Sequence, residues 1–319
     1  MIELKGVSKK YGETTAVNQI SFEVKEEENL VLLGTSGCGK TTTLKMINRL
    51  IEPDAGQIII NGHNIKQQNA EELRRGIGYV MQNIGLFPHY TVEENITVVP
   101  RLLNWNKNKT ASRVQELVEK LRLPENSLKL FPNELSGGQQ QRVGLARALV
   151  ANPAVLLMDE PFGALDNVTR ASIQQEFKDL EELKRKTIVM VTHDVQEAFE
   201  LADRICLMDK GEIMQIGTPA ELLFNPANAF ARKFLDGQRL ALEFKVIQIK
   251  HIWSNLPDAT QQDVKGLNPD LSVWEAMEKL HLIPTGTLTF SNCKGEIKLV
   301  GFNDLTKAFN LYKNAGNHG

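Results

Sequence analysis

"NLVLLGTSGCGKTTTLKMI", residues 29–47, decides the fold, because a short apolar run leads through a glycine-rich turn into a helical segment. The apolar run at 29–34 predicts a strand that is buried on both faces of a sheet. Residues 34–41 match the pattern G-x-x-x-x-G-K-[ST]. Between a strand and a helix, this pattern predicts a phosphate-binding loop whose backbone N–H groups converge on phosphate oxygens.

The last two residues of this loop carry charge and metal chemistry. Lys40 supplies a point charge to the β and γ phosphates of a nucleotide, and the Thr41 hydroxyl can bind Mg²⁺. The residues of this segment predicted to bind ATP are Gly34, Thr35, Ser36, Gly37, Cys38, Gly39, Lys40, Thr41 and Thr42.

Two later apolar runs end in polar residues that can complete the site. The run at 154–160 ends in Asp159 and Glu160, and the run at 187–193 ends in His193. At the carboxyl ends of parallel strands, such side chains project into the crevice where ligands bind. Asp159 is predicted to hold Mg²⁺ and Glu160 to polarise the attacking water. The alternative is that both carboxylates only cap a strand at the surface.

Three isolated residues extend this prediction. His193 can reach the γ-phosphate and hold the geometry of the water, although a single histidine is more often structural. Gln82 is a ligand of Mg²⁺ or water if its loop faces the site, and an exposed amide otherwise. Tyr11 can stack on adenine, or it is a buried tyrosine of a β-layer.

The segments around these motifs predict an α/β fold in two parts. Residues 2–24 alternate as an antiparallel β-layer does, and residues 204–217 predict a hairpin that turns at Lys210-Gly211. From residue 86 to about 150 the pattern is helical and contains no convincing strand. We therefore expect a nucleotide-binding core that is interrupted by a helical subdomain.

The C-terminal part of the chain has a different character. A polar segment with proline and glycine predicts a linker over residues 236–268, so that the first domain spans residues 1–235. Over residues 269–319 the pattern predicts a helix, two strands and a second helix. We expect these to form a small α+β domain.

Composition and charge exclude several kinds of protein. The net charge of −2 argues against a surface that coats nucleic acid, so no nucleic-acid partner is expected. Cys38, Cys206 and Cys293 are odd in number and far apart, which predicts a reducing cytosol and no disulfide. No apolar run approaches the roughly 18 to 20 residues that cross a bilayer. We expect any membrane part of a working complex to be supplied by another chain.

The segment "ELSGGQQQRVGLARALV", residues 134–150, predicts a second helix start that suits an anion. Ser136 and the N–H groups of Gly137 and Gly138 lie at the positive end of the helix that follows, where they can donate to a phosphate. A glycine-rich turn in this place is ordinarily only a cap. Here, however, Lys40 already serves the phosphate from one side, which leaves the other side for a partner.

Together these motifs resemble the ATP-binding subunits of ABC transporters. The loop at 34–41, Gln82, "LSGGQQQ", "LLMDEP", "ALD" at 164–166 and "VTHD" occur in the order and spacing of that family, over residues 1 to about 235. The resemblance implies a P-loop ATPase core with a helical subdomain, ATP and Mg²⁺ as ligands, and a homodimer whose subunits face each other head to tail. It also implies that each subunit binds the ATP of the other in trans through Ser136, Gly137, Gly138, Gln139 and Asp166.

Two stretches resemble one group of importers in particular. Residues 85–105 and 159–176 are similar to the ATPases that energise import of the osmoprotectants glycine betaine, choline and carnitine. This implies a peripheral ATPase on the cytoplasmic face of the inner membrane, which drives separate permease subunits and is served indirectly by a substrate-binding protein. Related motifs occur in subunits for sugars, polyamines or sulfate, so an importer ATPase for another small solute, such as an amino acid, stays open. A non-transport ABC ATPase is the more distant alternative.

The C-terminal segment resembles a single CBS module, whereas osmoprotectant ATPases often end in two. Asn303-Asp304 stands where these modules commonly have Thr or Ser before Asp to meet ribose and phosphate. We therefore expect a structural or dimerising role at least as much as nucleotide sensing.

Overall fold

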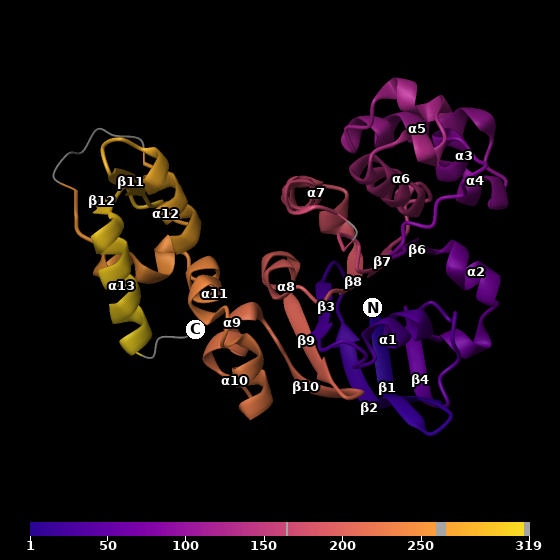
Figure 1. Ribbon diagram of the computed structural model, residues 1–319, viewed down its shortest axis with the longest axis horizontal. Helices are drawn as coiled ribbons and strands as arrows, with labels where there is room; N and C mark the ends of the chain where they lie inside the picture. The colour runs from indigo at the N-terminus through magenta and orange to yellow at the C-terminus, as the bar shows by residue number, and fades with distance from the viewer. Residues whose placement is uncertain (164, 260–265, 316–319) are drawn as a thin grey trace. The chain divides into compact units, whose positions relative to one another are not determined.

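The computed structural model describes residues 1–163, 165–259 and 266–315. Two compact units, Met1–Ile216 and Gly217–Gly319, make up the chain (Figure 1). Ala164 of the "ALD" motif, residues 260–265 of the predicted linker and residues 316–319 of the predicted C-terminal domain lie outside the described residues.

A six-stranded sheet in the order β10-β9-β3-β8-β7-β6 is the centre of the first unit. Its strands are β3 (Asn29–Gly34), β6 (Ile77–Val80), β7 (Val155–Asp159), β8 (Thr187–Val191), β9 (Arg204–Asp209) and β10 (Glu212–Gly217). β3 pairs in parallel with β8 and β9, and β7 pairs in parallel with β6 and β8. Every residue of β7 and β8 is buried, which confirms strands that are covered on both faces. β9 and β10 are joined at Lys210 and Gly211, which both have positive φ, as a tight hairpin turn requires.

An antiparallel sheet in the order β2-β1-β4-β5 forms a second layer. Its strands are β1 (Ile2–Tyr11), β2 (Thr14–Val24), β4 (Ala55–Ile60) and β5 (His63–Asn64). Helix α1 (Lys40–Ile47) joins the two layers, because its Leu44 and Met46 belong to one buried cluster with Leu4 of β1 and Leu30 of β3. The phosphate-binding loop therefore stands on a core shared by both sheets.

The predicted helical subdomain is present. Residues 86–150 are all described and contain no strand, and their helices form a separate purple group in Figure 1. These helices are α3 (Val92–Ile96), α4 (Val98–Leu102), α5 (Lys107–Lys120), η2 (Glu125–Lys129), η3 (Pro132–Glu134) and α6 (Gly137–Leu149). Helix α5 buries Val114, Leu117 and Val118, which lie on one face because they are three and four residues apart.

Five further helical segments complete the first unit. They are η1 (Ile65–Gln67), α2 (Ala70–Arg75), α7 (Asn167–Asp179), η4 (Leu183–Arg185) and α8 (Val195–Leu201). Among the helices of the described ranges, none is long and apolar enough to span a membrane.

The second unit begins earlier than the sequence predicted, after residue 216 instead of residue 235. Its elements are α9 (Pro219–Phe224), α10 (Ala229–Leu235), α11 (Arg239–Val246), η5 (Ile249–Asn255), α12 (Val273–Leu282), β11 (Thr287–Ser291), β12 (Ile297–Gly301) and α13 (Phe302–Asn314). α9 belongs to this unit because Arg239 of α11 donates to the Leu223 carbonyl oxygen at 2.7 Å. The predicted linker also starts differently, since Ile249 and Ile252 of η5 are fully buried.

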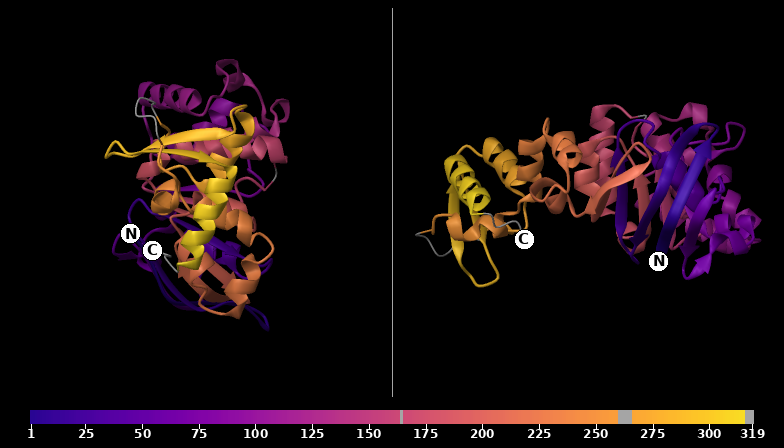
Figure 2. Two further views of the ribbon diagram at one scale, coloured as in Figure 1. Left: turned by 90° about the vertical axis from the view of Figure 1, so that its left-hand side faces the viewer. Right: turned by 90° about the horizontal axis from the view of Figure 1, so that it is seen from below.

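The core of the second unit lies on one face of the β11–β12 hairpin. Phe290 and Val300 of the hairpin are buried in one cluster with Leu280 of α12 and with Leu305 and Phe309 of α13. The hairpin and α13 are drawn in yellow in Figure 2. The predicted order of helix, strand, strand and helix is therefore present, and the resemblance to a CBS module stays a prediction.

Candidate functional site

The phosphate-binding loop is pressed against neighbouring backbone at two glycines. A Cβ on Gly34 would lie 2.0 Å from the carbonyl oxygen of Met208, and a Cβ on Gly39 would lie 2.4 Å from that of Ala16. Gly39 also has a left-handed backbone, with φ of 101°. Only glycine fits both places, so the loop can follow its path between β9 and the start of β2.

Polar contacts fix the loop further. The Lys40 ammonium is buried and donates to the carbonyl oxygens of Gly34 and Thr35, both at 2.9 Å. The Thr35 hydroxyl donates to Asp209 at 2.8 Å, and the Gly211 N–H donates to the Cys38 carbonyl at 3.2 Å. The loop is thus held in shape by the turn between β9 and β10 as well as by its own lysine.

Thr41 and Asp159, which are both predicted to hold Mg²⁺, lie in hydrogen-bonding contact. The Thr41 hydroxyl donates to Asp159 Oδ1 at 2.8 Å. Asp159 is 4% exposed, and this burial raises its pKa, while the hydrogen bond from Thr41 opposes the rise. Burial disfavours the charged carboxylate, so a cation at this place would stabilise it.

These donors fit Mg²⁺, which takes oxygen ligands and is usually held by one or two carboxylates together with substrate phosphates. A hydroxyl and a carboxylate oxygen converge in the pair Thr41–Asp159. In the part of the chain that the structure describes, no group of three or more His, Cys, Asp or Glu could hold a metal.

Glu160 is the centre of the second half of the site. Its Oε2 accepts a hydrogen bond from Gln82 at 2.9 Å, and its Oε1 lies 3.2 Å from His193 Nδ1. Its backbone has φ of 45°, an uncommon conformation for a residue other than glycine and one that concentrates at functional sites. The structure thus brings together Glu160, Gln82 and His193, which lie far apart in the sequence.

Tyr11 stands at the end of β1 and is 49% exposed. The ammonium of Lys9 lies 5.6 Å from the centre of its ring. The alternative of a buried tyrosine is therefore wrong. Stacking of this ring on adenine stays a prediction.

The two helix starts predicted to act in trans are both capped locally. Ser136 and Gln139 form a reciprocal capping box at the start of α6, with N–H to oxygen distances of 2.9 and 3.3 Å. Asp166 caps α7 by accepting from the N–H groups of Val168 and Thr169. Hydrogen bonds from Thr169 hold the pKa of Asp166 below its usual range. Gly137 is exposed and Gly138 is buried, and the action of all five residues in trans stays a prediction.

Two residues of this region were missed by the sequence analysis. Asp209 ends the apolar run of β9, so the rule that singled out Asp159 at a strand end could also have found it. Arg147 of α6 donates to the carbonyl oxygens of Ile84 and Gly85 at 2.8 and 2.7 Å and so holds the loop after Gln82. Its side chain gave no such signal in the sequence.

Comparison with known proteins identifies the family. Residues 17–163 match the sequence profile of the family described as ABC transporter. Two dimeric structures of the ATP-binding cassette MJ0796, one in a post-hydrolysis state bound to ADP and Pi, match with TM-scores of 0.62 and 0.61 and identities of 37% and 36%. Each match covers 68% of this chain and 98% of the cassette.

Two curated relatives are similar over most of this chain. The glycine betaine/carnitine/choline transport ATP-binding protein OpuCA of Bacillus subtilis strain 168 is 54% identical over 241 residues, which are 75% of this chain and 63% of that protein. The glycine betaine uptake system ATP-binding protein YehX of Escherichia coli strain K12 is 46% identical over 277 residues, which are 87% of this chain and 89% of that one. The matched segment is thus less than two thirds of OpuCA and most of YehX. With this identity, this coverage and the geometry of its P-loop, the chain belongs to the ATP-binding proteins of the ABC transporter family.

Proposed function

We propose that the chain hydrolyses ATP as one subunit of a homodimer and thereby energises import of a quaternary amine osmoprotectant, such as glycine betaine, choline or carnitine. The observation that carries this proposal is the cluster after β6, β7 and β8, where Glu160 meets Gln82 and His193 beside the Thr41–Asp159 pair. Such a set provides a base, a water-positioning group and metal donors next to a phosphate-binding loop.

Each residue of the cluster has one task in hydrolysis. Lys40 and the loop N–H groups bind and orient the phosphates. Thr41 and Asp159 would hold Mg²⁺, which when bound neutralises charge on the phosphates. Glu160 accepts a proton from the attacking water, while Gln82 and His193 keep that water and the carboxylate in line with the γ-phosphate.

The start of α6, at Ser136, supports the proposed dimer. The N–H groups of Gly137 and Gly138 open a helix of 13 residues and can donate to a γ-phosphate held by another copy of the chain. Binding of both ATP molecules then favours a closed dimer, and hydrolysis removes a contact of that dimer. The dimeric state of the MJ0796 cassette supports this arrangement.

Ser136→Arg tests the shared site. We expect the variant to bind ATP as a monomer and to lose dimerisation driven by ATP, because a large cation replaces the cap that faces the partner. Light scattering with and without ATP measures dimerisation. Both chains compared carry Glu160→Gln, so that ATP hydrolysis is slow. Unchanged dimerisation would remove Ser136 from the interface.

The surface around residues 87–103 supports a permease partner. Phe87, Tyr90 and Leu102 are 46%, 41% and 51% exposed. Behind them, the fully buried Asn95 accepts from the Phe87 N–H at 2.8 Å and donates to the carbonyl oxygens of Phe87, Tyr90 and Thr91. A buried amide with its bonds satisfied keeps the two aromatic rings presented outward, which suits an apolar segment of a membrane subunit.

Uptake measurements would identify the transported solute. The chain would be reconstituted in vesicles with its permease and binding protein, and uptake of glycine betaine, choline, proline and a sugar would be compared at low and high salt. We expect ATP-dependent uptake of betaine or choline. Uptake of only proline or the sugar would overturn the osmoprotectant assignment, and the ATPase rate without uptake would still test hydrolysis.

For the second unit we propose a structural or dimerising role. Its Asp304 accepts from the Gly301 N–H at 2.9 Å, so this carboxylate caps α13. One adenine nucleotide bound per chain in equilibrium dialysis is the expected result. Two per chain would favour nucleotide sensing by a CBS-like module.

A further inference from the structure

A charged cluster lies between the segment that carries Asp166 and the segment that carries His193. Arg170 of α7 donates through Nη2 to the Leu165 carbonyl oxygen at 3.0 Å, and its Nη1 lies 3.7 Å from Asp194 Oδ2. Leu165 precedes Asp166, and Asp194 follows His193. One guanidinium therefore contacts both segments.

Asp194 is linked to Glu197 through the hydroxyl of Thr192. Asp194 caps α8 by accepting from the N–H groups of Gln196 and Glu197, and its own N–H donates to the Thr192 hydroxyl at 3.0 Å. The same hydroxyl donates to Glu197 Oε2 at 2.9 Å. The two residues that flank His193 are thus hydrogen-bonded to each other and, through the Thr192 hydroxyl, to Glu197.

Two atoms of this cluster are buried without a hydrogen-bond partner among the described residues: Arg170 Nε, a donor, and Glu197 Oε1, an acceptor. A buried carboxylate with an unpaired oxygen costs stability. The charged groups that act on Glu197 are Asp194 on its own helix, Arg170 on α7 and Glu160 after β7. Burial raises the pKa of Glu197 to about 7, while the hydrogen bond from Thr192 opposes the rise.

The start of α7 also touches the other helix start. A Cβ on Gly138 would lie 3.0 Å from Thr169 Cγ2 and 3.3 Å from Ile173 Cδ1, so α6 and α7 are packed closely at the glycine turn. A displacement of Ser136 and its turn by a partner subunit would therefore reach α7 and Arg170.

We propose that Arg170 and Glu197 are positioning residues that couple the surface predicted to meet the partner's ATP to His193, which meets the ATP of its own subunit. The coupling rests on the proposed ATP hydrolysis by a dimer. When the Ser136 turn and Asp166 close on the partner's nucleotide, Arg170 transmits the shift to the carboxylates that hold the segment 192–194. The two sites of the dimer then hydrolyse ATP in a coupled manner.

ATP hydrolysis by the full-length chain tests the coupling, with Arg170→Met, Glu197→Gln and the control Lys178→Met. Lys178 pairs with Glu200 at 3.4 Å and so joins the same two helices, α7 and α8, through residues that lie outside both segments. For Arg170→Met we expect a fall in kcat of about ten- to a hundredfold, as small misplacements of catalytic groups give. The Hill coefficient for ATP should fall toward 1, while ATP binding to the monomer is unchanged. Lys178→Met should keep the wild-type kcat and Hill coefficient.

Glu197→Gln keeps the size of the side chain and removes its charge. The ratio of wild-type kcat to that of this variant should rise as pH increases from about 6 to about 8, because only the ionised carboxylate attracts Arg170. Taking the ratio cancels the ionisation of ATP itself. A ratio that is constant with pH, a wild-type Hill coefficient in Arg170→Met, or an equal loss in Lys178→Met would each overturn the coupling. A wild-type chain that hydrolyses no ATP would instead overturn the proposed function.

Discussion

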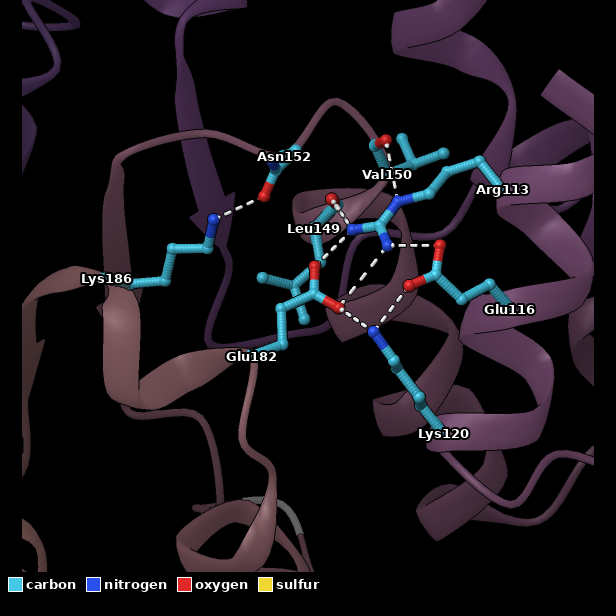
Figure 3. A network of polar contacts seen from close by, with 8 residues as sticks. All are labelled: Arg113, Glu116, Lys120, Leu149, Val150, Asn152, Glu182 and Lys186. Carbon is cyan, nitrogen blue, oxygen red and sulfur yellow. Dashed lines mark hydrogen bonds and ion pairs between the residues drawn. The ribbon is translucent and has the colours of Figure 1, made fainter. Parts of the chain in front are cut away.

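Two charged networks of the first unit differ in how completely their atoms are paired. In the network of Figure 3, Arg113 of α5 bonds to Glu182 and Glu116 and donates to the carbonyl oxygens of Leu149 and Val150. Lys120 bonds to the same two carboxylates. In the cluster of Arg170 and Glu197, by contrast, a buried donor and a buried acceptor have no partner among the described residues.

The difference separates a structural role from a functional one. The Arg113 network joins the helical subdomain to the segment before β8, and its guanidinium has carboxylate or carbonyl oxygens around it, as stable proteins arrange buried charges. Incomplete pairing at Arg170 and Glu197 is costly, and it lies next to the residues that we assign to hydrolysis. Such unfavourable arrangements concentrate where function requires them.

The largest expected effect is on activity at Glu160. Glu160→Gln should bind ATP and lose turnover by about a hundredfold or more, because the amide cannot accept the proton of the attacking water. Phosphate release under saturating MgATP measures turnover, and light scattering should find the closed dimer trapped. The free energy of unfolding should change little. Hydrolysis near the wild-type rate would remove Glu160 from the role of base.

Arg113→Met should have the opposite profile, with a loss of stability and little loss of activity. Breaking a buried ion pair by removing one partner costs about 3 kcal/mol or more, and here two carbonyl oxygens also lose a donor. Urea unfolding of the chain without nucleotide measures this loss. Lys184→Met is the matched control, because its pair with Glu181 is exposed. A fall in kcat larger than the loss of folded protein accounts for would show that the Arg113 network also serves the ATPase site.

The site residues that follow buried strands could be predicted from the sequence, but the charged contacts between helices could not. The glycine loop, Asp159, Glu160 and His193 follow buried strands, and the rule that ligands bind at the carboxyl ends of parallel strands found them. Arg113 and Arg170 have no such signal, since both lie on amphipathic helices where an arginine is usually a solvated charge. Their partners are 69 and 24 residues away in the chain, as Glu182 and Asp194. Only the packing of the helices brings these charges together.

The predicted domain boundary had a similar limit. Residues 217–235 are helical, and a helical pattern does not say against which core a helix packs. The structure assigns them to the second unit. The polar linker was expected to start at residue 236, but apolar residues of η5 are buried in the second core.

Glu197→Gln tests the cluster of Arg170 and Glu197 through the free energy of unfolding. Because burial raises the pKa of Glu197 to about 7, the folded state binds the proton more tightly than the unfolded state does. The stability due to this group is present at low pH and is lost as pH rises from the usual range of a carboxyl to about 7. The variant does not titrate, so its free energy of unfolding should exceed that of the wild type by an amount that grows by roughly 2 to 3 kcal/mol between pH 5 and pH 8. Urea unfolding at four or five pH values measures this difference. A difference that is the same at every pH would contradict the raised pKa.

The smallest expected effect tests whether the Arg113 network depends on its exposed member. The Lys120 side chain is 39% exposed, and water and salt screen its pairs with Glu116 and Glu182. Lys120→Met should therefore lower the free energy of unfolding by less than about 1 kcal/mol, and the loss should shrink further at high salt. Glu182 keeps Arg113 as its main partner in this variant, whereas in Arg113→Met it keeps only the exposed lysine. Equal losses of unfolding free energy in Lys120→Met and Arg113→Met would mean that the network acts as a whole. Burial, and not the completeness of hydrogen bonding, would then distinguish it from the cluster of Arg170 and Glu197.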